Sequence, residues 1–313
     1  MTWAQRIGHR LKLRDLHILL TVVRSGSMGR AAIDLAVSQP AVSKAISDLE
    51  HTLGVRLLDR SSQGVEPTAY GQALLRCGIA VFDDLRRGVR EIEFLADPSA
   101  GELSLGCTEP LAAGFVSVVI DHLSQCHPKA LFQVVSADPV VLLNRDLRQR
   151  QIELALARAT GLTLHEETQF DFLFDDRHVI LVGEKSQWAR RRNIVLADLI
   201  EQPWVLPSPD TPVGLHIGDA FRAAGLEPPR ARVLTFSIPM HQRLLATGRF
   251  ITTLPVSMLH HAKHLPLRLL PVKFPAHPRP IGIVTLRNRT LSPLAQHFVE
   301  LAHKLAKKLP GVQ

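Results

Sequence analysis

The sequence has few aromatic and few sulfur-containing residues, and both shortages narrow the classes of protein that it can encode. Aromatic residues make up only 5%, with a single tyrosine, which argues against RNA binders that stack bases on aromatic platforms. The three cysteines, Cys77, Cys107 and Cys126, have no CxxC spacing, so neither a disulfide framework nor a four-cysteine zinc site is expected. No apolar run reaches the roughly eighteen residues of a membrane span, and the N-terminal stretch lacks the apolar core of a secretion signal. We therefore expect a cytoplasmic protein without a membrane partner.

The remaining composition is that of a folded, basic protein. The 313 residues are 46% apolar, and a domain usually takes about 150 residues, which predicts two or three domains. The formal net charge of +8 favours a polyanionic partner. Residues 1–76 hold ten Lys and Arg against six Asp and Glu, a net charge of +4.

The chain has two parts with different predicted secondary structure. Residues 13–97 read as nearly all helix, and residues 101–302 as short strands alternating with helices. The run from Asp97 to Gly101 contains Pro, Ser and Gly and separates the two parts. Alternating strands and helices predict an α/β sheet with ligands near the carboxyl ends of the strands.

Three short helices near the N-terminus are predicted from apolar spacing. The first has apolar residues at helical spacing at Leu13, Leu16, Leu20 and Val23. Ser27 and Ser38 are N-cap candidates for the second and third helices. On the third helix an apolar stripe opposes a polar face: the stripe is Val42, Ala45, Ile46, Leu49 and Leu53, and the face is Pro40, Ser43, Lys44 and Ser47.

This pattern fits a helix-turn-helix whose last helix enters the major groove of DNA. Ser38 and Gln39 then lie at a helix N-terminus, where backbone N–H groups suit phosphate. Lys44 and Arg60 would neutralise phosphates, and the turn that contains Gln63 would form a wing. An ordinary helical bundle with a solvated face has the same pattern, so the residues alone leave both interpretations open.

A long helix is predicted from about Thr68 to Ala96. Leu75, Phe82 and Val89 recur every seven residues, and Leu85 and Ile92 lie between the repeats. We call these five apolar residues the seam. They must be covered by a second copy of the chain or by the helix's own domain. Few neighbouring elements are available to cover it, which favours a homodimer.

The segment from Leu13 to Gly71 resembles the winged helix-turn-helix of LysR-type transcriptional regulators. The resemblance is carried, in order, by SGS before RAA, SQPAVSKAISDLE, LGVRLLDR and PTAYG. It implies a winged helix-turn-helix over 1–67, a linker and dimerisation helix over 68–97, and an effector domain over 98–313. That domain is expected to be a two-lobed α/β fold of the periplasmic-binding-protein type, with lobe 1 at about 98–173 and 276–313 and lobe 2 at about 174–275.

The resemblance also implies partners and site residues. The expected partners are double-stranded promoter DNA, a small-molecule effector and RNA polymerase, and the homodimers are expected to pair into homotetramers. The residues expected to contact DNA are Ser27, Ser38, Gln39, Pro40, Ser43, Lys44, Ser47, Arg60, Gln63 and Thr68. The residues expected to line the effector cleft are Thr108, Glu109, Ser136, Ser208, Asp210, Thr211, Ser237 and Thr253.

The chemistry of these cleft residues leaves the ligand class open. Hydroxyls and N–H groups at helix starts suit a carboxylate or a phosphate. Glu109 and Asp210 add negative charge, so a polyol or a cation-bearing ligand remains an alternative. Cys107 lies near the same helix start, a position that would lower the pKa of its thiol.

No catalytic motif is present. The sequence has no GxSxG, no P-loop, no GxGxxG after a strand and no set of metal ligands. We therefore expect a protein that is not an enzyme, with no catalytic residue, no metal and no cofactor. Two alternatives are a small-molecule-binding protein that does not read DNA and, less favoured, an α/β enzyme.

Overall fold

The structure is a computed structural model that describes residues 10–61, 64–158, 166–259 and 266–309. The chain divides into two compact units, Met1–Gly88 and Val89–Gln313. No helix among the described residues is long and apolar enough to cross a membrane.

The first unit consists of three short helices, a hairpin and the start of a long helix. Its elements are α2 (Leu13–Ser25), α3 (Met28–Asp34), α4 (Gln39–Leu53), β1 (Leu58–Ser61), β2 (Gly64–Pro67) and α5 (Ala69–Ala96), which continues into the second unit. Gly26 ends α2 with a φ of 65°, a left-handed conformation that glycine adopts at little cost. The strands β1 and β2 pair antiparallel. Buried side chains from α2, α3 and α4 form one core under this hairpin.

The buried face of α2 differs from the one expected from leucine spacing. Leu13 is 47% exposed, whereas Leu16, Leu19 and Val22 are buried. The apolar run in this helix is nearly continuous, so spacing alone could not decide which side faces the core. The stripe predicted on α4 is buried at Val42, Ala45, Ile46 and Leu49, and Leu53 packs half-buried against the same core.

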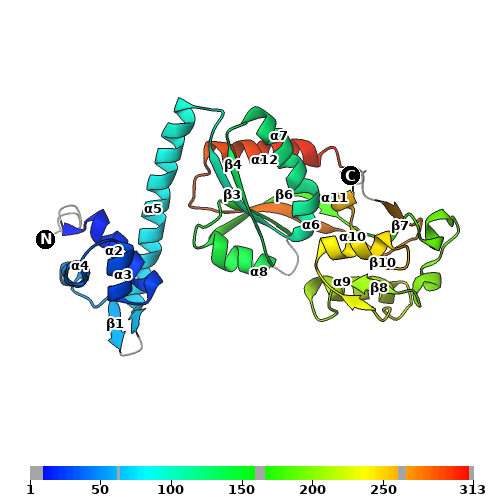
Figure 1. Cartoon of the computed structure of the whole chain (residues 1–313), viewed down its shortest axis with the longest axis horizontal. Coiled ribbons are helices and arrows are strands. Elements are labelled where there is room, and N and C mark those ends of the chain that lie inside the picture. Colours follow the sequence, from blue (N-terminus) through cyan, green and yellow to red (C-terminus); the bar gives the residue numbers. More distant parts are fainter. Residues whose placement is uncertain (1–9, 62–63, 159–165, 260–265, 310–313) are drawn as a thin grey trace. The chain divides into compact units, whose positions relative to one another are not determined.

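Within the second unit, two five-stranded mixed sheets define two lobes (Figure 1). The sheet of lobe 1 has the order β4-β3-β5-β12-β6. Its strands are β3 (Glu102–Cys107), β4 (Leu131–Ser136), β5 (Leu154–Arg158), β6 (Thr168–Asp176) and β12 (Arg279–Leu286). The helices α7 (Ser117–Cys126) and α12 (Pro293–Ala306) lie side by side and share a core with this sheet. The short helices α6 (Glu109–Leu111) and α8 (Pro139–Val141) each run into a π-helical turn.

The sheet of lobe 2 has the order β11-β7-β10-β8-β9. Its strands are β7 (His178–Gly183), β8 (Trp204–Leu206), β9 (Val233–Leu234), β10 (Ile251–Pro255) and β11 (Leu267–Leu269). Its helices are α9 (Pro212–Ala223), α10 (Ile238–Ala246) and α11 (Val256–Leu259), with 3-10 turns at Gln187–Arg190 and Leu196–Leu199. Trp204 and Phe221 are fully buried in its core, with ring centroids 5.4 Å apart.

One long strand was not expected from the sequence. β6 belongs to the sheet of lobe 1 and continues to Asp176, past the expected change of lobe at residues 173–174. Phe170, Phe172 and Phe174 alternate along it, which is the period-two signal of a strand. Lobe 2 therefore begins with β7 at His178.

Candidate functional site

The helix α4 has a buried stripe on one side and polar side chains on the other. Gln39, Pro40, Lys44 and Ser47 are exposed, and Ser43 is half-buried. Pro40 lies in the first turn, where its missing N–H group costs no helical hydrogen bond. The buried stripe holds the helix on its unit and leaves Lys44 directed to solvent.

Three of the residues expected to contact DNA cap helices. Ser27 Oγ accepts a hydrogen bond from Arg30 N at 3.5 Å, and Ser38 Oγ accepts one from Ala41 N at 3.4 Å. Thr68 Oγ1 accepts from Gly71 N at 3.1 Å and donates to the Arg56 carbonyl at 2.8 Å. These side chains stabilise the starts of α3, α4 and α5. Arg60 is exposed on β1, and Gln63 lies outside the described residues.

The residues of the predicted dimer seam on α5 fall into two groups. Leu75 packs half-buried against the core of the first unit, and the ring centroids of Phe82 and His17 are 5.5 Å apart. Further along the helix Leu85, Val89 and Ile92 are exposed, Ile92 to 69%. Large apolar side chains exposed in a row at this spacing are typical of a helix that pairs with another helix.

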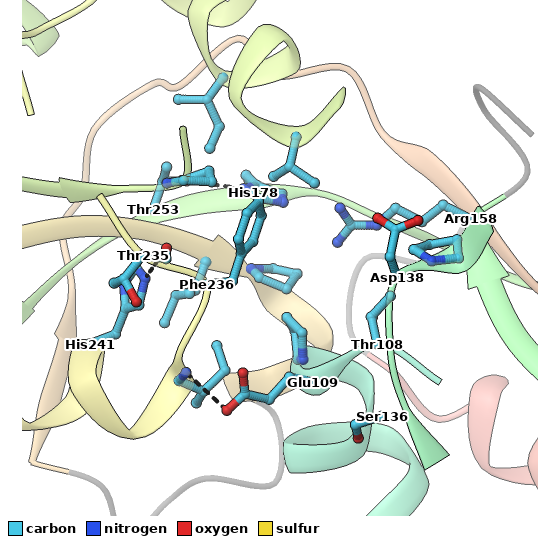
Figure 2. A pocket seen from close by; sticks show the side chains of 18 of the residues that line it. Thr108, Glu109, Ser136, Asp138, Arg158, His178, Thr235, Phe236, His241 and Thr253 are labelled. Carbon is cyan, nitrogen blue, oxygen red and sulfur yellow. Dashed lines mark hydrogen bonds between the residues drawn. The ribbon is translucent and has the colours of Figure 1, made fainter. Parts of the chain in front are cut away.

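A cavity of about 440 Å³ lies in the second unit, with walls from both lobes (Figure 2). Four of the expected effector residues line it: Thr108, Glu109, Ser136 and Thr253. Most other lining residues are apolar, and they include Pro207, Val213, Ile217, Phe236, Ile238 and Leu254. The additional polar lining residues are Asp138, Arg158, His178, Thr235 and His241.

The other four expected effector residues do not line this cavity. The Ser208 hydroxyl donates a hydrogen bond to the Asp210 carboxylate. Thr211 Oγ1 caps α9 by accepting from Gly214 N at 3.1 Å, and Ser237 Oγ caps α10 by accepting from Met240 N at 3.4 Å. The oxygens of these side chains thus form hydrogen bonds within the turns that precede α9 and α10. A place in the sequence shortly after a strand did not suffice to bring these residues into the cavity.

Glu109 joins the two lobes at the wall of the cavity. Its Oε1 accepts a hydrogen bond at 3.1 Å from the backbone N of Ile238, at the start of α10. A carboxylate at a helix N-terminus is favoured by the helix dipole and by the N–H groups there. The negative charge of Glu109 is therefore used by the protein itself, which the sequence had left open.

Arg158 brings a guanidinium group to the cavity from the end of β5. Its Nη2 lies 3.8 Å from Oδ2 of Asp176, and the Arg158 side chain is 16% exposed. The Asp176 carboxylate also accepts hydrogen bonds from Ser257 N at 3.1 Å and Ser257 Oγ at 2.6 Å. Burial lowers the pKa of Arg158 and raises that of Asp176, and their mutual attraction opposes both changes. Since an arginine normally titrates far above neutral pH, Arg158 remains a cation.

Two buried histidines lie beside this arginine. His178 is 5% exposed and His216 is 7% exposed, and their ring centroids are 5.8 Å apart. His178 Nδ1 is 3.3 Å from Thr253 Oγ1, whereas Nε2 of each ring is buried and has no hydrogen-bond partner in the part of the chain that the structure describes. Burial, and secondarily the charge of Arg158, lowers the pKa of His178; burial, then Arg279 and Arg158, lowers the pKa of His216 to about 4.

The protein is expected to lose stability as the pH falls from about 6.5 to about 4, because His216 is neutral when folded. The unfolded chain takes up this proton near the ordinary pKa of 6.5 and the folded chain only near 4, so the unfolded state holds more protons in between. This stability is fully present above pH 6.5, and its loss amounts to about 3 kcal/mol by pH 4. Urea unfolding of the protein and of His216→Phe over this pH range measures the effect. If the free energy of unfolding changes equally with pH in both proteins, His216 is not the cause of the loss of stability.

Sequence reasoning missed Arg158 and His178. The signal for Arg158 was present, because it ends the strand ELALAR and ligands gather at carboxyl ends of strands. His178 begins its strand, so the same rule pointed away from it. Phe236 follows β9 in a loop, where an aromatic residue gives no sequence signal for a ligand.

Cys107 does not have the environment expected from its place before a helix. It is fully buried in the core of lobe 1, and burial raises the pKa of its thiol to about 12. The desolvation of the thiolate outweighs any attraction from the helix start. A thiol of this kind stays protonated at neutral pH and is a poor nucleophile.

A winged helix-turn-helix and a two-lobed α/β domain with a cavity define a class of transcription regulators that bind DNA and a small molecule. Family models agree with this class: "Bacterial regulatory helix-turn-helix protein, lysR family" matches residues 13–72, and "LysR substrate binding domain" matches residues 96–307. The chain belongs to the LysR family of DNA-binding transcriptional regulators with an effector-binding domain.

Relatives and solved structures of similar sequence and fold belong to the same family. The chain is 26% identical to the uncharacterized regulator YdcI of Escherichia coli over 95% of this chain and 96% of that protein. It is 29% identical to the regulator GbpR of Azospirillum brasilense over 92% of this chain and 84% of that protein. The fold matches a full-length OxyR variant of Pseudomonas aeruginosa with a TM-score of 0.64, 20% identity and coverage of 97% and 100%. It also matches CbnR in complex with its target DNA, with a TM-score of 0.54, 22% identity and coverage of 95% and 100%.

Proposed function

We propose that this regulator binds promoter DNA through α4 and the β1–β2 hairpin, and that an effector in the cavity between the lobes changes this binding. The observation that carries the proposal is the cavity itself, whose walls come from both lobes. A ligand that contacts both walls stabilises one arrangement of the lobes over another. Such a ligand can therefore change a property of the whole regulator.

The DNA contacts are assigned by the exposure of each side chain. Gln39, Ser43, Lys44 and Ser47 would contact base edges or nearby phosphates from the polar face of α4, beside Pro40. Ser27, Ser38 and Thr68 cap helices, so their contribution would be to aim backbone N–H groups at phosphates. Arg60 on β1, together with Gln63, would contact the backbone or the minor groove as a wing.

The assembly and the division of the chain follow from α5. We assign a DNA-binding domain to 1–67, a dimerisation helix to 68–97 and an effector domain to 98–313. Exposed apolar residues along α5 support a homodimer, which would place two copies of α4 on two half-sites of DNA. Pairing of dimers into tetramers, contact with RNA polymerase and a cytoplasmic location complete the proposal. Catalysis has no part in it.

Lys44→Ala is expected to weaken binding to a specific promoter site by about 1–3 kcal/mol, because the substitution removes a charged contact at the groove. The control is Lys304→Ala, which removes the same charge from an exposed position on α12. Titration of a labelled promoter fragment by fluorescence anisotropy, at several salt concentrations, measures both variants. Equal weakening by the two substitutions would indicate nonspecific electrostatics and would remove Lys44 from the interface.

A further inference from the structure

One end of the cavity holds a buried donor group and a cation that the protein itself does not fully use. His178 Nε2 is buried and has no hydrogen-bond partner among the described residues. Arg158 lies beside it, with its side chain directed into the cavity (Figure 2). A buried polar atom without a partner costs free energy unless a ligand or water completes it. A polar group of a ligand that reaches this end of the cavity would give both side chains a partner.

The donors of Arg158 are only partly occupied. A guanidinium carries five N–H groups, and the ion pair with Asp176, at 3.8 Å, is longer than a hydrogen bond. Asp176 meanwhile receives two hydrogen bonds from Ser257. Asp176 thus has partners other than Arg158, and toward the described residues Arg158 retains donors for a ligand.

The second donor comes from His178. Burial keeps its imidazole neutral, so only one ring nitrogen carries a proton. The contact between Nδ1 and the Thr253 hydroxyl allows either ring tautomer, and we assign the one in which the hydroxyl donates to Nδ1 and the proton stays on Nε2. An Nε2–H group and a guanidinium side by side both require an acceptor.

The carboxylates and the second histidine of the cavity are already in use. Glu109 accepts from Ile238 N, and Asp138 accepts from Val140 N at 2.8 Å. The ring nitrogens of His241 lie 2.9 Å from Thr252 Oγ1 and 3.3 Å from the Thr235 carbonyl. Two carboxylates in the wall disfavour a dianion, and the remaining lining, with Phe236 and Ile217, is largely apolar.

We propose that the effector is a monocarboxylate with an apolar body, whose carboxylate binds Arg158 and His178 and whose body packs against Phe236, Ile217 and Leu254. The carboxylate satisfies the geometry of a guanidinium and accepts the Nε2–H hydrogen bond. This inference rests on the proposed function of the cavity and names the ligand class that the cavity takes.

Matched acids and amides test the ligand class. The probes are 3-phenylpropanoate and hexanoate, each compared with its uncharged amide, by isothermal titration calorimetry on the full chain. The acids are expected to bind at least about tenfold more tightly than the amides, because only the acids form charge-assisted hydrogen bonds. Equal affinities, or no binding of either acid at millimolar concentration, would overturn the proposal.

Substitutions test the two residues. His178→Phe and Arg158→Gln are each expected to remove the preference for acids. His178→Gln, whose amide nitrogen can replace Nε2, is expected to restore part of it. Arg279→Gln is the control, because Arg279 is a neighbouring arginine that does not line the cavity. If Arg158→Gln fails to fold, the comparison of His178→Phe with His178→Gln decides the outcome. A preference for acids that persists in His178→Phe would overturn the assignment.

Failure of this inference can be told apart from failure of the proposed function. A metabolite extract is divided, and one half is treated with a carbodiimide and methylamine, which converts carboxylates to amides. The untreated half is expected to change the affinity for promoter DNA, and the treated half is expected not to. Equal effects of both halves would refute the carboxylate and leave the effector model intact. Absence of an effect from either half, with the acids bound in calorimetry, would contradict the effector model and leave the binding site intact.

Discussion

Ile92→Glu is expected to convert the proposed homodimer into monomers. Ile92 is 69% exposed in the single chain, so the substitution costs the monomer little. In a paired α5 the two glutamates would lie buried near one another, which weakens the dimer by about 3 kcal/mol or more. Light scattering measures the mass directly. Affinity for a two-half-site promoter is expected to fall together with the mass.

A control on the same helix separates pairing from helix stability. Ala73→Glu introduces the same carboxylate at an exposed position of α5 outside the seven-residue repeat. This variant is expected to keep the mass of the parent. Phe82→Glu is a less specific test, since Phe82 also contacts His17 within the first unit. If Ile92→Glu keeps the mass of the parent, α5 does not pair through these apolar residues.

Gly71→Ala is expected to destabilise the first unit by about 3 kcal/mol, as in severe overpacking. A Cβ on Gly71 would lie 2.0 Å from the carbonyl oxygen of Leu57 and 3.3 Å from Cβ of Pro67. The main obstacle is backbone, so α5 and the β1–β2 hairpin would have to separate. Loss of DNA binding is expected with the loss of stability, because the proposed wing would be displaced.

The matched control for Gly71 is Gly88 on the same helix. A Cβ on Gly88 has no neighbour within 4 Å. Gly88→Ala is expected to stabilise α5 by about 0.5–1 kcal/mol through helix propensity. Thermal unfolding of both variants measures the difference. Equal unfolding temperatures would show that α5 does not approach the hairpin as closely as described.

The helices of the first unit could be predicted from the sequence because their caps and breaks are local. Ser27 and Ser38 cap α3 and α4, and Gly26 ends α2. The choice of buried face on α2 could not be predicted, since it depends on α3 and α4 packing against a helix that is apolar on several sides. Local signals fix where a helix begins, whereas tertiary packing decides which side is buried.

Only some of the residues that line the cavity could be predicted from the sequence, for a related reason. Thr108 follows β3 and Ser136 ends β4, and the carboxyl ends of these parallel strands meet at one edge. His178 enters from the amino end of β7 and meets Arg158 only because the chain crosses between lobes there. Residues brought together by a change of lobe leave no periodic signal in the sequence.

This chain is expected to read DNA under the control of a small molecule. A footprint on DNA upstream of its own gene, with and without a metabolite extract and at several salt concentrations, tests it most directly. We expect protection of an interrupted palindrome, with edges that shift when the extract is added. Sequence-blind protection that disappears at modest salt and ignores the extract would contradict the account.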